Sequence, residues 1–178
     1  FIRSSFIQRI NSDLANDIGN LSQRTLSFVF KNLEGILPAV PEALQHEDKQ
    51  LIVAADGLLD TVRTSFEQQA FHNGLKQIWE VVAAANRYID QMAPWALRKT
   101  DPNRMADVLG VLLETIRQVA ILLQPIMPNS AEQLLDQLKV KSDERNFDSL
   151  GGAGRLIAGR RIDKPSGVFP RFSEDEAS

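Results

Sequence analysis

Apolar residues three or four positions apart recur along most of this chain, and prolines and glycines interrupt the pattern at intervals. Five stretches between the interruptions have the spacing of an amphipathic helix, namely residues 4–32, 47–68, 70–90, 102–124 and 128–138. Alternation of valine and isoleucine over strand-length windows is scarce. Because short connections between long amphipathic helices favour antiparallel packing, the sequence predicts an all-α fold, an antiparallel bundle of about five helices.

The pattern changes after residue 141, so we expect a division between a helical bundle, residues 1–141, and a C-terminal segment, residues 142–178. The segment has the composition of an extended tail packed by its aromatic side chains, with a mobile acidic end at residues 174–176. Its glycine cluster, residues 151–154, is not followed by the Lys-Ser or Lys-Thr of a phosphate-binding loop. We therefore predict a flexible linker there.

Composition limits the class of protein. The 178 residues are 43% hydrophobic and 24% charged, which suits one globular domain, and no run approaches the roughly 18 apolar residues of a bilayer span. The chain has no cysteine and no apparent secretory leader, so a cytoplasmic protein without membrane contact is expected. It begins with Phe1 inside a helical pattern, as a piece of a longer protein would. A net charge of −3 argues against general nucleic-acid binding, which needs many basic contacts to phosphate.

Three polar residues, Asn16, Asn20 and Arg24, are four positions apart in the first predicted helix. Each step of four advances about 40° beyond a full turn, so the three side chains follow one face. The apolar stripe of this helix lies on another face and consists of Ile10, Leu14, Ile18, Leu21, Thr25 and Phe28. Amide and guanidinium groups can bind base edges or phosphates, although an ordinary solvated surface would have the same spacing.

A second candidate follows the third helix, which should end before Pro94 because proline disfavours helix in the preceding residue. Trp95 comes next, and a tryptophan at a helix end can stack on an unpaired base or can cover the core. Trp79 is different because it continues the apolar stripe of residues 71–85, so we predict that it belongs to the core. His46 and His72 have no second ligand at metal spacing, so neither a metal site nor a catalytic site is predicted.

Four segments resemble a known family: residues 11–21 together with Arg24, residues 86–89 leading to 93–95, residues 123–128, and residues 169–171. In this order they are similar to the anticodon-binding domain of bacterial methionyl-tRNA synthetases, and they span nearly the whole chain. The first segment also resembles related class I synthetases. Pro94 followed by Trp95 is the part most particular to the methionine enzyme.

The resemblance implies that Asn16, Asn20 and Arg24 read the CAU anticodon of tRNA-Met, that Trp95 stacks on the first anticodon base, and that Pro94 sets the turn presenting the ring. It also implies a catalytic domain elsewhere in the same parent chain, with ATP and Mg²⁺ as the cofactors of that parent. This chain contains neither a His-x-Gly-His element nor a Lys-Met-Ser-Lys-Ser loop, so it should have no cofactor and no aminoacylation activity of its own. A monomer is expected.

Two alternatives stay open from the sequence. The chain could be the matching domain of another class I synthetase, such as the valyl, leucyl or cysteinyl enzyme, or a helical protein-interaction module without RNA binding. The sequence also leaves open whether the basic cluster of Arg155, Arg160, Arg161 and Lys164 contacts tRNA phosphates or a catalytic domain.

Overall fold

The computed structural model describes residues 2–167. The chain folds into a helical bundle, and no strand is present among these residues; the backbone pairing of Ile36 with Arg161 is an isolated bridge. The α-helices are α1 (Ile2–Asn32), α2 (His46–Asp56), α3 (Leu58–Glu67), α4 (Phe71–Met92), α5 (Pro94–Thr100), α6 (Pro102–Leu123) and α7 (Pro128–Gln137). Three short 3₁₀ helices follow, η1 (Ser142–Glu144), η2 (Phe147–Ser149) and η3 (Gly151–Gly154). The predicted all-α bundle is confirmed.

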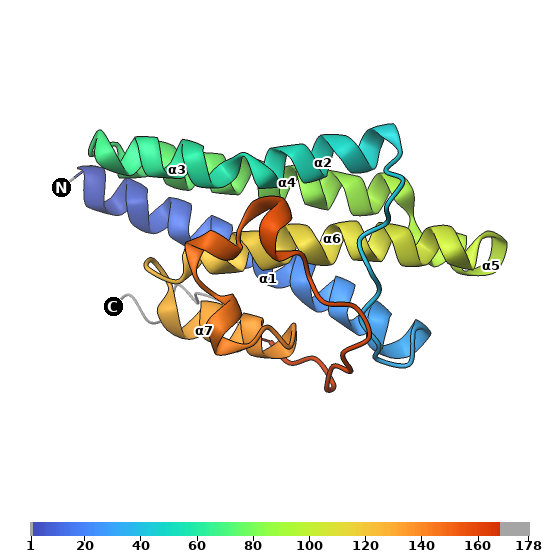
Figure 1. The fold of residues 1–178 in the computed structure, drawn as a ribbon. Helices are drawn as coiled ribbons and strands as arrows, with labels where there is room; N and C mark the ends of the chain where they lie inside the picture. Colours follow the sequence, from blue (N-terminus) through green and yellow to red (C-terminus); the bar gives the residue numbers. More distant parts are fainter. Residues whose placement is uncertain (1, 168–178) are drawn as a thin grey trace.

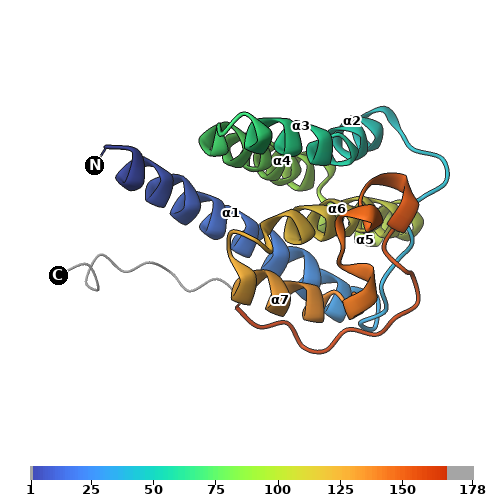
Figure 2. The same cartoon turned by 60° about the vertical axis from the view of Figure 1, so that its left-hand side comes forward.

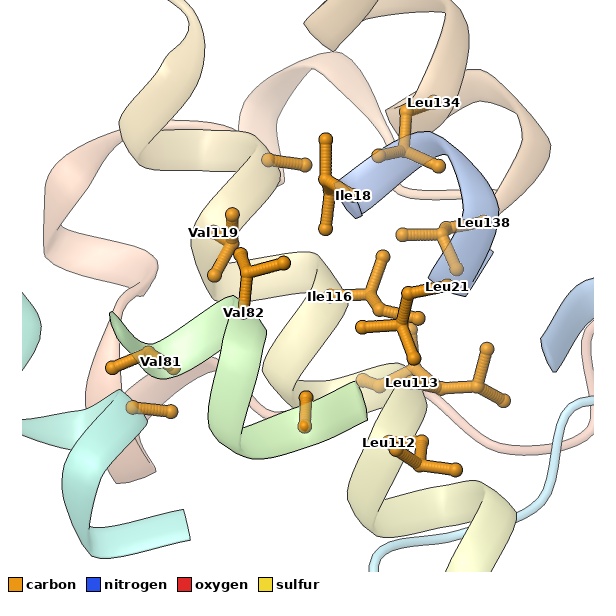
Figure 3. Packing of buried hydrophobic residues seen from close by; sticks show 14 of the residues in the cluster. Ile18, Leu21, Val81, Val82, Leu112, Leu113, Ile116, Val119, Leu134 and Leu138 are labelled. Atoms are coloured by element: carbon orange, nitrogen blue, oxygen red, sulfur yellow. The ribbon is translucent and has the colours of Figure 1, made fainter. Parts of the chain in front are cut away.

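Helix α6 is the centre of the bundle. Every residue from Val108 to Leu123 is buried, and α1, α2, α4, α5 and α7 all pack against this helix. The chain passes back and forth through α1, the α2–α3 pair, α4, α6 and α7, so that consecutive long segments are antiparallel (Figure 1). The N-terminal part of α1 extends beyond the other helices (Figure 2). Figure 3 shows the core between the helices, where labelled side chains include Ile18, Leu21, Val82, Ile116, Val119, Leu134 and Leu138.

Glycine is required at one position of α6. A Cβ atom added to Gly110 would collide with the carbonyl oxygen of Ala39, in the connection between α1 and α2. The connection therefore lies directly against the backbone of the central helix. Any residue other than glycine at position 110 would push it away.

The predicted helix over residues 47–68 is divided at Gly57 into α2 and α3. Gly57 has φ −81° and ψ −10°, and its N–H still donates to the carbonyl of Val53 at 3.0 Å. The break is therefore slight, and it falls at the residue with the lowest helix propensity in the stretch.

Two residues show what happens at the helix starts. Asp101 caps α6, because its Oδ1 accepts the backbone N–H of Arg104 at 3.1 Å, and Pro102 is the first helical residue. Phe71 is exposed although it continues the apolar stripe of α4, since it lies in the first turn and contacts only the edge of the bundle, with its ring 5.3 Å from that of Phe66. No helix in the described residues has the length and apolar character needed to cross a bilayer.

The segment after residue 141 packs on the bundle, but not through aromatic side chains. Its buried residues are the aliphatic Leu150, Leu156 and Ile162, whereas Phe147 is exposed. Aliphatic side chains therefore pack the described part of the segment, and the predicted packing by aromatic residues stays a prediction for the residues beyond it. Phe169 and Phe172, residues 169–171 of the resemblance and the acidic residues 174–176 lie outside the described residues.

The glycine cluster is also not the flexible linker that its composition predicts. Residues 151–154 form η3, and a Cβ atom on Gly154 would collide with the carbonyl oxygen of Ser149. The glycines allow a compact turn in contact with the preceding residues, which composition alone could not distinguish from a linker.

The four basic residues of the predicted cluster, Arg155, Arg160, Arg161 and Lys164, do not form one free cluster. Arg155 donates to both carboxylate oxygens of Asp56, at 2.7 and 2.9 Å, and Arg160 binds Glu144 at 2.7 Å. Arg161 and Lys164 are exposed. Two of the four charges are therefore neutralised inside the chain and stabilise the C-terminal segment.

Candidate nucleic-acid interface

The connection from α4 to α5 places an indole ring in solvent. Ala93 ends α4 in the left-handed conformation, with φ 49° and ψ 65°, and its N–H donates to the carbonyl of Ile89 at 3.0 Å. Pro94 is buried and begins α5, where a fixed φ suits the first helical residue. Trp95, the next residue, is 45% exposed. The expectation that Trp95 faces solvent at a helix end agrees with this geometry, and the alternative of a lid over the core does not.

Arg24 of α1 lies beside this ring. Its guanidinium carbon is 5.9 Å from the centroid of the Trp95 ring, within the range of a cation–π contact, which contributes about 0.5–1 kcal/mol at exposed sites. The structure therefore brings together two predicted site residues that are far apart in the sequence.

Asp90 of α4 also binds Arg24, with 3.0 Å between its Oδ1 and Nη2 of the arginine. Both side chains are largely in water, at 45% exposure for Arg24 and 65% for Asp90, so this ion pair adds little stability. Its effect is to restrict the orientation of the guanidinium near the indole. Sequence reasoning missed Asp90, and no local signal identifies it, because only the packing of α4 on α1 brings the two charges together.

Asn16 and Asn20 continue the row from Arg24 along α1. Both are exposed, and within residues 2–167 neither amide group has a hydrogen-bond partner in the protein. From the helical rise, Asn20 lies about 6 Å and Asn16 about 12 Å from Arg24 along the axis. The row therefore offers unpaired donors and acceptors over a length that two or three nucleobases could occupy.

Trp79, which was predicted to belong to the core, and Tyr88 of the same helix differ in burial. Tyr88 is buried, whereas Trp79 is only partly buried and its indole N–H donates to Oδ2 of Asp17 at 2.6 Å. Trp79 lies against the core, but it also joins α4 to α1 at the surface, which its place in the apolar stripe does not reveal. It can still be distinguished from Trp95, whose N–H has no such partner among the described residues.

The described residues contain no group of three His, Cys, Asp or Glu side chains that could hold a metal ion, and His46 and His72 are both exposed. Polar hydrogen-bonding groups and one exposed aromatic ring are therefore the chemistry that the candidate interface offers. Such a surface can bind unpaired nucleobases by stacking and by hydrogen bonds to their edges.

Comparison with known proteins agrees with this chemistry. The family model described as the anticodon binding domain of methionyl tRNA ligase matches residues 38–178. The methionine–tRNA ligase of Rhizobium meliloti is 51% identical over 169 residues, which are 95% of this chain and 33% of that protein. The enzyme of Mycobacterium tuberculosis is 43% identical over 172 residues, or 94% of this chain and 33% of that protein.

Solved structures give the same result. The methionyl-tRNA synthetase of Mycobacterium tuberculosis in complex with methionyl-adenylate has a TM-score of 0.86 at 43% identity, over 94% of this chain and 33% of that one. Its apo form has a TM-score of 0.84 at 41% identity, over 96% of this chain and 34% of that one. The chain therefore spans about a third of the length of these relatives. Because the family model matches most of its length, the chain belongs to the family of the anticodon-binding domain of methionyl-tRNA ligase.

Proposed function

We propose that this chain recognises the CAU anticodon of tRNA-Met, with Trp95, Pro94, Arg24, Asn20 and Asn16 as its binding residues. The single observation that carries the proposal is the juxtaposition of the exposed Trp95 ring with the Arg24 guanidinium at 5.9 Å, on a surface where two further amides are unpaired. Family membership supports the same class of ligand.

In the proposed mechanism, one residue supplies most of the affinity for the anticodon and other residues discriminate between its bases. A base that leaves the anticodon loop loses its stacking partner. Stacking on the face of Trp95 replaces that contact and contributes about 1–3 kcal/mol to binding. Stacking does not distinguish cytosine from uracil, because every base has a π-face. The amides of Asn16 and Asn20 and the guanidinium of Arg24 supply the directional hydrogen bonds that can discriminate base edges.

We assign aminoacylation to the part of the parent enzyme outside this chain. The relatives are methionine–tRNA ligases of about three times this length, and one solved relative binds methionyl-adenylate. ATP and Mg²⁺ would be bound by that part, a catalytic domain, because the interface described above offers stacking and hydrogen bonding but no nucleophile or metal site. In this proposal the bundle, residues 1–141, docks the anticodon end of tRNA-Met. Residues 142–178 pack on the bundle or on the catalytic domain, and the intact enzyme is a cytoplasmic monomer.

Titration with anticodon stem-loops tests the proposal. We expect a CAU stem-loop to give a saturable change in tryptophan fluorescence, and stem-loops with a changed anticodon base to bind more weakly in a filter-binding comparison. Equal retention of CAU and unrelated triplets would instead indicate the domain of a valyl, leucyl or cysteinyl enzyme. No saturable change with any stem-loop would indicate a protein-interaction module.

Arg24→Ala should reduce the ratio of affinities for CAU and a single-base variant by about fivefold, since a net hydrogen bond contributes about 1 kcal/mol. Filter binding with both stem-loops measures the ratio. Arg63→Ala is the matched control, because Arg63 is an exposed arginine of α3, at the other end of the bundle from α5 (Figure 1). An unchanged ratio for Arg24→Ala would remove this residue from base reading, and an equal effect of Arg63→Ala would indicate loss of general charge attraction.

A further inference from the structure

Asp48, in the first turn of α2, joins three helices through one buried carboxylate. Its side chain is 0% exposed and accepts the phenol O–H of Tyr88 at 2.6 Å. Arg104 donates to both oxygens, from Nη1 at 2.7 Å and from Nη2 at 2.8 Å. Tyr88 belongs to α4 and Arg104 to α6, so the relative positions of α2, α4 and α6 depend on this one side chain.

The two residues that bind Asp48 lie on either side of the segment carrying Trp95. Tyr88 precedes it in the last turns of α4, and Arg104 follows it in the first turn of α6. Arg104 also reaches back to the end of α4, where its Nη2 is 3.7 Å from the sulfur of Met92. The helices on both sides of the segment 93–101 therefore bind the same carboxylate.

Helix α5 is held by the ends of α4 and α6 and by one hydrogen bond to α1, from Nη1 of Arg98 to Oδ1 of Asn32 at 3.2 Å. It has seven residues, and its main packing partner among the helices is α6. In Figure 1, α5 extends from the end of the bundle where α4 ends and α6 begins. A shift of the first turn of α6 relative to α4 would therefore move α5, and with it the ring of Trp95.

The charges of the group are stable near neutral pH. Burial raises the pKa of Asp48, but hydrogen bonds from Arg104, Tyr88 and the backbone N–H of Gln45 outweigh burial and hold this pKa below its usual range. Burial and the hydrogen bond to Asp48 raise the pKa of Tyr88, so its hydroxyl remains a donor. Asp48 and Arg104 are therefore charged, Tyr88 is neutral, and both oxygens of Asp48 accept hydrogen bonds from these two partners.

We propose that Asp48 is a positioning residue for the anticodon site: by binding Tyr88 and Arg104 it sets α5 so that the indole of Trp95 lies beside Arg24. The inference rests on the proposed function. Asp48 is buried and does not contact RNA itself. It acts through α4 and α6, whose ends define the position of the ring.

The same helix supplies a matched control for the substitution Asp48→Asn. Asp56, at the other end of α2, also binds one arginine with both oxygens, at 2.7 and 2.9 Å, but its partner is Arg155 of the C-terminal segment. Asp56 also accepts from Gln118 at 2.8 Å and is 30% exposed, so Asp56→Asn removes a more accessible arginine-binding carboxylate of the same helix without touching the ends of α5. Both variants are compared with the unsubstituted chain at a temperature where circular dichroism shows each to be folded.

Two measurements distinguish positioning from general stability. Asp48→Asn should weaken binding of a CAU stem-loop roughly 2- to 30-fold, the range for substitutions that act without touching the ligand, while Asp56→Asn leaves it unchanged. In chains labelled with fluorotryptophan, Asp48→Asn should also shift the fluorine NMR signal of Trp95, assigned with a Trp79→Phe variant, and Asp56→Asn should not. This second measurement needs no RNA, so it tests positioning even if the stem-loop does not bind.

The proposal is wrong if Asp48→Asn leaves both the stem-loop affinity and the Trp95 signal unchanged. It is equally wrong if Asp56→Asn changes both as strongly. Should Asp48→Asn fail to fold, Tyr88→Phe decides, because it removes only the phenol hydroxyl from the group and keeps the buried ring. A smaller loss of affinity with a shift of the Trp95 signal is then expected, and the absence of both would overturn the inference.

Discussion

Replacing Trp95 with alanine is expected to weaken binding of a CAU anticodon stem-loop by about 1–3 kcal/mol, or roughly 5- to 150-fold. The ring is 45% exposed, lies at the start of α5 and has the Arg24 guanidinium carbon 5.9 Å from its centroid. Since alanine has no π-face, the substitution would remove the stacking partner that we propose for the first anticodon base. Fluorescence anisotropy of a labelled stem-loop measures the loss without using tryptophan as the reporter.

The fold should survive this substitution. Because much of the ring is already in water, Trp95→Ala should leave the helical circular dichroism signal and the urea midpoint nearly unchanged. Trp79→Phe is the matched control: Trp79 lies between α1 and α4 with its N–H on Asp17, so its loss should alter stability and spare the anticodon affinity. A collapsed fold in Trp95→Ala would identify Trp95 as a core residue and contradict the proposed site.

Glu114→Ala should lower the free energy of unfolding by about 3–5 kcal/mol, the cost of breaking a buried ion pair by removing one partner. Glu114 is 0% exposed and accepts from Arg117 at 2.5 and 3.0 Å and from the backbone N–H of Leu156 at 2.8 Å. Alanine would leave the guanidinium of Arg117 buried without its counter-ion, and would leave the N–H of Leu156 without an acceptor. Urea denaturation followed by circular dichroism measures the change.

Glu132→Ala on α7 is the control, because Glu132 is exposed and its loss should change stability by no more than about 0.5 kcal/mol. A change below about 1 kcal/mol for Glu114→Ala would show that water or another side chain replaces the carboxylate, since a buried charge left unpaired costs more than that. Arg117 also donates to the carbonyl of Ser149 at 2.8 Å, so Glu114→Ala should loosen residues 149–156 first. Hydrogen exchange of the Leu156 amide would then be faster than in the control.

The helices were predictable because their determinants are local. Burial on one side of a helix repeats every three to four residues, and the cap at Asp101 needs only the N–H of Arg104, three residues away. The division at Gly57 was not predicted, because a slight break in a helix depends on the elements packed against it. The exposure of Phe71 was not predicted either, because the neighbouring elements determine where the buried stripe of a helix ends.

The C-terminal segment shows where local patterns fail. Its composition indicated a flexible, aromatic-packed tail, whereas Leu150 and Leu156 are buried and Arg155 binds Asp56, 99 positions earlier in the sequence. Glu114 and Arg117 are a second example. In the sequence they indicate only that the apolar run around them is interrupted by charges and cannot span a bilayer. Their burial as a pair depends on the segment that covers them, and neither partner can be found from helical spacing.

Local spacing was enough to find the long helices α1, α4 and α6, the polar row of Asn16, Asn20 and Arg24, and the tryptophan after Pro94, because each depends on one stretch of chain. The separate helix α5 was not found in this way. Only the tertiary structure decided that Arg24 lies over the ring of Trp95, that Asp90 binds Arg24, and that Asp48 joins the three helices around α5. The physical reason is that periodicity defines which face of a helix is buried but not which helix covers it. The site arises where α1 and α4 pack together, and that contact is a property of the whole bundle.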